Sequence, residues 1–126
     1  DNKALSALLE EAWRRGRVLA AVCHGPAGFV NIRDENGAYI VKDRRVNCFT
    51  DNEERAVKKQ DIVPFLLESK LRERGAIFEC QDNFQAYVAE DGQLITGQNP
   101  PSASLVGNAI LRALGISPFE KTAVNQ

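Results

Sequence analysis

A short apolar run that leads directly into a cysteine-containing turn is the feature that most constrains this fold. Residues 18–22 read Val-Leu-Ala-Ala-Val, which is typical of a strand buried on both faces in a parallel sheet. Residues 23–26, Cys-His-Gly-Pro, follow at once. Gly25 permits a sharp turn, and Pro26 suits the first turn of a helix that we expect to reach residues 29–30. The sequence therefore predicts a strand, a tight turn and a helix within an α/β fold.

Helical and strand patterns alternate along the rest of the chain. An amphipathic helix is predicted over residues 5–13, because its apolar residues recur at helical spacing and Gly16 follows as a stop. Gly107, inside the last predicted helix, indicates a close packing contact. The other predicted elements are helices at 52–58 (capped by Thr50 or Asp51), 63–74 and 101–114, strands at 77–80, 86–89 and 93–96, a hairpin signal at Asn36-Gly37 flanked by 38–41 and 45–49, and a surface tail from about 117.

Two observations indicate that the chain starts inside its own domain. It contains no methionine. Its first buried strand follows a single predicted helix, so we expect the parallel neighbours of that strand to come from elsewhere. We therefore expect residues 1–126 to be the C-terminal portion of one larger domain, with the N-terminal strands absent from this chain.

Charge and cysteine content narrow the classes of partner and compartment. Sixteen Lys and Arg against seventeen Asp and Glu leave a net charge of -1 and a pI near 5.9. This balance gives no electrostatic basis for binding nucleic acid or an anionic membrane, and no apolar run is long enough to span a bilayer. Three widely spaced cysteines suit free thiols in a reducing compartment, so we expect a cytoplasmic protein.

Cys23 is the candidate nucleophile. Ligands of open α/β sheets gather at the carboxyl ends of strands, and a cysteine on a tight turn there lies beside a helix N-terminus. That N-terminus and the imidazole of His24 can both lower a thiol pKa from its ordinary value of about 8.5. A cysteine after an apolar strand can instead be a core residue, but the His-Gly-Pro sequence that follows favours a catalytic role.

The remaining cysteines and the single histidine limit the other chemistry available. Cys48 and Cys80 lie inside predicted strands, and we interpret both as packing residues. His24 is the only histidine of the chain, and the three cysteines lack zinc-ligand spacing, so we expect neither a metal nor a cofactor. Residues 94–102 resemble a strand that runs into a helix N-terminus, where backbone N–H groups and polar side chains could line a pocket.

A catalytic imidazole needs an acceptor that fixes its orientation, and three acidic residues are candidates. Asp51, Glu53 and Glu54 follow the strand predicted at 45–49 and could reach the same sheet edge as His24. The same three residues could simply form an acidic first turn that complements a helix dipole. The residues alone leave both interpretations open.

Four segments follow one another along the chain, namely residues 20–27 (AAVCHGPA), 48–54 (CFTDNEE), 63–68 (VPFLLE) and 94–103 (LITGQNPPSA). In this order they resemble the ThiJ/PfpI superfamily, and within it the heat-shock chaperone and glyoxalase III branch. The resemblance implies a flavodoxin-like three-layer sandwich with a mainly parallel central sheet and the nucleophile turn at 22–26. It also implies a triad of Cys23 as nucleophile, His24 as its neighbouring histidine and Glu54 as the acid.

Two family elements have no counterpart here, namely an early acidic residue that contacts the cysteine and a Gly-Gly-His-Gly segment at the oxyanion site. Both would precede Asp1, so we expect the chain to be inactive alone. The implied reaction converts methylglyoxal to lactate, or glyoxal to glycolate, without glutathione. The implied partners are a small reactive aldehyde, the N-terminal half of the same domain and a second copy in a homodimer. A cysteine peptidase or amidase, and a non-enzymatic holdase or redox sensor, are the alternatives.

Overall fold

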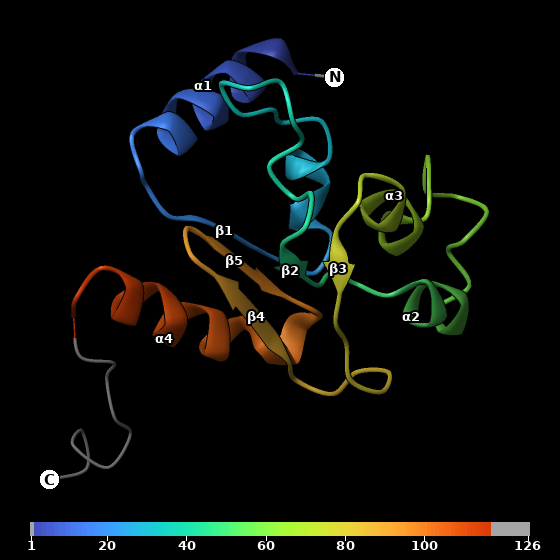
Figure 1. The fold of residues 1–126 in the computed structure, drawn as a ribbon. Coiled ribbons are helices and arrows are strands. Elements are labelled where there is room, and N and C mark those ends of the chain that lie inside the picture. The colour runs from blue at the N-terminus through green and yellow to red at the C-terminus, as the bar shows by residue number, and fades with distance from the viewer. Residues whose placement is uncertain (1, 117–126) are drawn as a thin grey trace, which may run out of the picture.

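The computed structural model describes residues 2–116, and its helices and strands form a mixed α/β fold (Figure 1). The tail predicted from about residue 117 lies outside the described residues. The elements are, in order, α1 (Lys3–Arg14), β1 (Leu19–Val22), the 3-10 helix η1 (Gly25–Phe29), β2 (Arg45–Val46), α2 (Asp51–Ala56), α3 (Leu67–Glu73), β3 (Ile77–Phe78), β4 (Val88–Asp91), β5 (Leu94–Gly97), the 3-10 helix η2 (Pro100–Ser102) and α4 (Ala103–Ala113).

The main sheet has the strand order β1-β5-β4. β1 runs parallel to β5, with Leu19 opposite Leu94, and β4 returns antiparallel to β5. The expectation that all parallel neighbours of β1 come from elsewhere was therefore wrong, because β5 of the same chain is one of them. Burial on both faces was also wrong for most of β1. Only Leu19 is buried, since β5 is the single sheet neighbour of β1 among the described residues.

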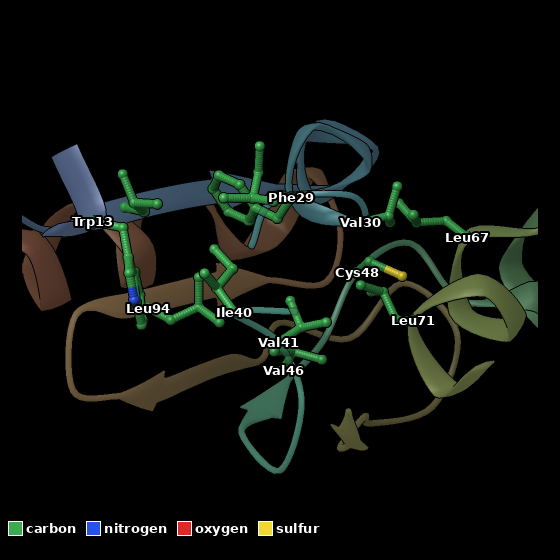
Figure 2. Close-up of a cluster of buried hydrophobic side chains, with 12 residues drawn as sticks. Trp13, Phe29, Val30, Ile40, Val41, Val46, Cys48, Leu67, Leu71 and Leu94 are labelled. Atoms are coloured by element: carbon green, nitrogen blue, oxygen red, sulfur yellow. The ribbon is translucent and has the colours of Figure 1, made fainter. Parts of the chain in front are cut away.

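β5 separates two apolar cores, which gives the structure its layers. All four residues of β5 are buried, and successive side chains of a strand point to opposite faces. Leu94 packs in one cluster with Trp13 and Phe29, whereas Ile95 packs in the other with residues of α4. Figure 1 shows α1 on one side of the sheet and α4 on the other. Figure 2 shows the first cluster extending to Cys48, Leu67 and Leu71, where α3 closes it.

The Asn36-Gly37 turn forms, but no strand forms at 38–41, and the strand predicted at 45–49 is reduced to Arg45–Val46. Gly37 has φ +81°, and the turn closes a single bridge between Arg33 and Tyr39. Ile40 and Val41 then turn into the core as buried side chains and join no ladder. β2 is only two residues long and pairs in parallel with the equally short β3.

For α1 and α3, the glycine that ends each helix was identified from the sequence, whereas the start of α3 was not. Gly16 and Gly75 end α1 and α3 at positive φ values, as left-handed C-terminal residues do. α3 starts at Leu67 and not at residue 63, because Val63 precedes Pro64 and is therefore biased away from helical backbone. Among residues 2–116, no helix combines the length and the apolar character needed to cross a membrane.

The close glycine contact occurs at Gly97 and not at Gly107. A Cβ atom built on Gly97 would lie 2.4 Å from Val106 Cγ2 and 3.1 Å from Val22 Cγ2. A Cβ on Gly107 would meet nothing within 4 Å. Gly97 thus permits α4 to pack closely against the carboxyl ends of β1 and β5, where the candidate site lies.

Candidate active site

Cys23 occupies the tight turn predicted after the first strand. Its φ of +64° lies in the left-handed region, which is uncommon for a residue other than glycine. The Cys23 N–H donates to the Gly97 carbonyl at 2.9 Å, and the Cys23 carbonyl accepts from the Phe49 N–H at 2.8 Å. β5 on one side and the segment after β2 on the other therefore hold this strained turn in place.

Cys23, His24 and Glu54 lie in one hydrogen-bonding line. Cys23 Sγ is 3.4 Å from His24 Nδ1, and His24 Nε2 is 2.7 Å from Glu54 Oε2. The His24 side chain is half exposed, whereas that of Glu54 is 4% exposed. With Nε2 donating its hydrogen to the carboxylate, the lone pair of Nδ1 faces the sulfur. The arrangement is that of a nucleophile, a base and an acid that orients the base.

The cap of α2 brings Glu54 to the imidazole. Thr50 is the N-cap, and its hydroxyl accepts from the Glu53 N–H while the Glu53 carboxylate accepts from the Thr50 N–H. This reciprocal pair is a capping box, and it fixes the first turn of α2. Of the three acidic candidates, only Glu54 contacts His24. Asp51 accepts instead from the Ser69 hydroxyl on α3.

The surroundings of Cys23 favour its neutral thiol. Burial raises the pKa of Cys23, the His24 backbone N–H lowers it, and the carboxylates of Glu53 and Glu54 raise it again, with a net increase. The expectation that a helix N-terminus and an imidazole lower this pKa was therefore wrong. The element after the turn is only a five-residue 3-10 helix, and burial is the largest of the causes that raise the pKa of Cys23.

The other two cysteines occupy different environments. Cys48 is fully buried in the core, as predicted for a packing residue, and burial raises the pKa of its thiol. Cys80 is exposed, so its interpretation as a packing residue was wrong; β3 ends at Phe78, before it. A pocket of about 440 Å³ includes Cys80, Thr50 and Glu68 in its lining but neither Cys23 nor His24.

Residues 94–102 were predicted as a possible pocket lining, but three of their polar side chains are buried and make hydrogen bonds inside the protein. Gln98, Asn99 and Ser102 are each 0% exposed. Gln98 exchanges hydrogen bonds with the backbone of Gln81, and Asn99 donates to the Gln85 carbonyl at 2.7 Å. They therefore hold the loop over residues 81–85 against the end of β5.

Two aromatic residues beside the site were missed from the sequence. The Phe49 ring lies 4.7 Å from the His24 ring, and the Phe84 ring lies 6.1 Å from the Phe49 ring, centroid to centroid. The position of Phe49 directly before the Thr50 cap was a usable signal for its place near His24. Nothing in the sequence around Phe84 indicates its turn. Among residues 2–116, no group of three His, Cys, Asp or Glu side chains is arranged to hold a metal ion.

Comparisons with known proteins agree on one kind of relative. No protein-family model matches the chain. A Schizosaccharomyces pombe protein named a probable glutathione-independent glyoxalase is 36% identical over 107 residues, which are 79% of this chain and 47% of that protein. The structure of glyoxalase III from Candida albicans is 28% identical with a TM-score of 0.82, over 88% of this chain and 49% of its own.

A third match supports the fold alone. A two-domain protein from Anabaena variabilis, with DJ-1/ThiJ/PfpI-like and ferritin-like domains, has a TM-score of 0.63 at 24% identity, over 95% of this chain and 28% of its own. The chain spans about half the length of the curated relatives it matches.

Proposed function

This chain belongs to the DJ-1/ThiJ/PfpI family, and from that premise we propose that it carries the reactive centre of a glutathione-independent glyoxalase. Its substrates would be methylglyoxal and glyoxal, and its products lactate and glycolate. The observation that carries the proposal is the line from Cys23 Sγ through His24 to Glu54, with separations of 3.4 and 2.7 Å. The glyoxalase names of the relatives favour this reaction over peptide cleavage and over a purely non-enzymatic role.

The first step is addition of the thiol to the aldehyde. Because the pKa of Cys23 is raised, the sulfur loses its proton as it attacks, and Nδ1 of His24 is the nearest side-chain base. The new S–C bond converts the aldehyde to a hemithioacetal, whose oxygen takes up a proton. Glu54 stabilises the imidazolium that forms in this exchange, because its buried carboxylate accepts from Nε2.

The second step moves one proton between neighbouring carbons. A base removes the hydrogen from the hemithioacetal carbon, and the electron pair shifts toward the adjacent carbonyl to give an enediol. Return of a proton to the second carbon gives an α-hydroxy thioester. Water then cleaves the S–C bond, releasing the hydroxy acid and restoring the Cys23 thiol. His24 is our candidate for the proton transfers, with backbone N–H groups at the turn as donors to the oxyanion.

We also propose that residues 1–126 form the C-terminal portion of one larger domain. The half-length match to the relatives and the single sheet neighbour of β1 support this view. A preceding segment would supply further strands, an acidic residue near Cys23 and the remaining oxyanion donors, so the isolated chain would be inactive. We propose further that the protein forms a homodimer. We also propose a cytoplasmic location, which the three free thiols among the described residues support.

The test is a product assay on the protein expressed from the complete reading frame that contains this chain. We expect loss of methylglyoxal and equal gain of lactate without added glutathione. Cys23→Ala should lower turnover by roughly 10³-fold or more, as removal of a covalent nucleophile does. Unchanged turnover in Cys23→Ala would rule out the covalent mechanism. Cleavage of a peptide substrate by a protein that makes no lactate would move the assignment to the peptidases.

A further inference from the structure

Two consecutive glutamates follow the cap of α2. One contacts His24, and the other holds a loop that lies near it. Glu54 contacts the imidazole Nε2 directly at 2.7 Å. Glu53 is 0% exposed and makes no contact with His24, yet it accepts four hydrogen bonds. Those from Thr50 close the capping box, and the other two come from the loop at residue 84 and from the end of β5.

The loop residue held by Glu53 is strained. Phe84 has φ +62°, in the left-handed region, where a bulky side chain is an outlier. Its N–H donates to Glu53 Oε2 at 2.8 Å. Asn99 Nδ2 donates to the same oxygen at 2.8 Å and to the carbonyl of Gln85 at 2.7 Å. A strained backbone of this kind persists only where its surroundings hold it. Here the buried Glu53 carboxylate accepts from the Phe84 N–H, and the buried Asn99 amide donates to the Gln85 carbonyl.

The conformation held in this way adds a ring to an aromatic array that ends at the imidazole. The Phe84 ring lies 6.1 Å from the Phe49 ring at 57°, and the Phe49 ring lies 4.7 Å from the His24 ring at 39°. These separations are within the range of favourable tilted aromatic pairs. Phe49 is 6% exposed, whereas its aromatic neighbour Phe84 is 43% exposed.

His24 needs a second contact to fix the orientation of its ring. Its side chain is 51% exposed, and one hydrogen bond at Nε2 fixes one atom while the ring can still turn about that contact. The direction of the Nδ1 lone pair toward Cys23 Sγ depends on that rotation. A ring packed against the imidazole restricts the rotation, and a second ring behind it keeps the first in place.

We infer that Glu53 and Phe84 are positioning residues, with Glu53 holding the strained backbone of Phe84 and the Phe84 ring orienting His24 toward Cys23 through Phe49. The kinetic consequence rests on the proposed function. The orientation of His24 is measurable without it.

Phe84→Gly separates the ring from the backbone. Glycine adopts a positive φ without strain, so the loop conformation remains accessible while the ring is lost. In the protein from the complete reading frame, we expect kcat for methylglyoxal to fall roughly tenfold, with KM changed by less than about twofold, since small misplacements of reacting groups are costly. Phe84→Tyr keeps the ring and should retain nearly full activity. Lys58→Gly is the matched control, because Lys58 has φ +60° on an exposed position without a ring.

Nuclear magnetic resonance of the imidazole gives a readout that a merely structural role would not move. His24 is the only histidine of residues 1–126, and its signals can be assigned in histidine-labelled protein by comparison with His24→Gln. We expect Phe84→Gly to shift the His24 ring signals through the changed position of Phe49, while Phe84→Tyr and Lys58→Gly leave them in place. In the unmutated protein, the Phe84 amide proton should exchange slowly with solvent, because it is hydrogen-bonded to the Glu53 carboxylate.

Three results would overturn the inference. One is Phe84→Gly with unchanged His24 signals and unchanged kcat. Another is Phe84→Tyr as impaired as Phe84→Gly, which would make the loop and not the ring responsible. A third is free exchange of the Phe84 amide, which would remove Glu53 from the array. Shifted His24 signals in a protein that makes no lactate would contradict the proposed reaction and support the positioning role.

Discussion

In the proposed reaction, Cys23 loses its proton as it attacks and does not rest as a preformed thiolate. Burial and the nearby carboxylates of Glu53 and Glu54 raise the pKa of the thiol, and only the His24 backbone N–H opposes them. His24 Nδ1, at 3.4 Å, is therefore needed at the moment of attack. A neutral resting thiol is also less easily oxidised than a thiolate, which suits an enzyme more than a redox sensor.

The rate of Cys23 alkylation against pH tests this residue directly. In a Cys80→Ser background, which removes the exposed thiol, we expect the iodoacetamide reaction to rise with pH with a midpoint above about 8.5, the ordinary thiol value. The sign follows from the raised pKa, because the reactive thiolate then forms only at higher pH. A midpoint below about 7.5 would contradict the neutral resting thiol, since it falls in the range of activated thiols.

Glu54→Gln tests the acid of the triad. An amide still reaches Nε2 but cannot stabilise an imidazolium with a full negative charge, so we expect kcat to fall by roughly 10²-fold or more. Glu73→Gln is the matched control, because Glu73 is an exposed glutamate on α3. Equal kcat values for Glu54→Gln and Glu73→Gln would exclude Glu54 from the reaction.

At the scale of elements, β5 is the centre of the arrangement. It pairs with β1 and β4, separates the two cores and supplies the carbonyl of Gly97 that accepts from Cys23. Close packing of α4 on this strand depends on the missing side chain at Gly97. The end of β5 thus couples the packing of the sheet to the position of Cys23.

Two glycine substitutions should therefore act in opposite directions. Gly97→Ala places a Cβ 2.4 Å from Val106 Cγ2, so we expect it to lower the free energy of unfolding by about 1–3 kcal/mol, as overpacking does. Gly107→Ala meets nothing within 4 Å and should raise the free energy of unfolding by up to about 1 kcal/mol through helix propensity. Urea unfolding measures both. A stable Gly97→Ala protein with full activity would contradict the close contact.

The cap of α2 should contribute to the stability of the protein. Thr50→Ala removes the hydroxyl that accepts from the Glu53 N–H and donates to its carboxylate, so we expect a loss of about 1 kcal/mol in the free energy of unfolding. Thr50→Ser keeps the hydroxyl and should remain close to the unmutated protein. If both variants unfold at the same urea concentration as the unmutated protein, the capping box contributes nothing to stability.

The sequence predicted those elements whose signals are local. The apolar run before Cys23, the stop at Gly16 and the cap at Thr50 each depend on neighbouring residues, and each was found. The pairing of β2 with β3 depends on two residues from each strand, which is too short for any periodicity. The positive φ of Phe84 is held by the distant side chains of Glu53 and Asn99 and has no local signal. Cys80 is exposed beyond the end of β3, and its alternating neighbours did not indicate that the strand ends at Phe78.

The residues of the candidate site also divide into those that local sequence predicts and those that it does not. Cys23 and His24 follow from the strand and turn that precede and contain them. The residues alone did not choose among Asp51, Glu53 and Glu54, whereas the family resemblance pointed to Glu54, and in the structure Glu54 is the one that contacts His24. The contacts of Glu53 beyond its own cap required the tertiary structure, because these two partners lie 31 and 46 positions away along the chain.

At the scale of the whole molecule, the described residues form a three-layer sandwich in which Cys23, His24 and Glu54 lie in one hydrogen-bonding line. Helices α1 and α4 lie on opposite sides of the main sheet (Figure 1). Cys23 and His24 follow the end of β1 directly, and Glu54 reaches His24 from α2. The proposed preceding segment would add strands beside β1 and complete the oxyanion site. We therefore expect the isolated chain to make no lactate, even when Cys23 remains alkylatable.

The measurement that tests the central claim most directly is lactate formation from methylglyoxal, without glutathione, by the protein from the complete reading frame and its Cys23→Ser variant. Serine changes one atom of the side chain and keeps its hydrogen-bonding capacity, so folding should be preserved. We predict lactate formation by the unmutated protein and a loss of roughly 10³-fold or more in the variant, as expected for a covalent nucleophile. Lactate formation by Cys23→Ser within a few-fold of the unmutated rate would contradict the account.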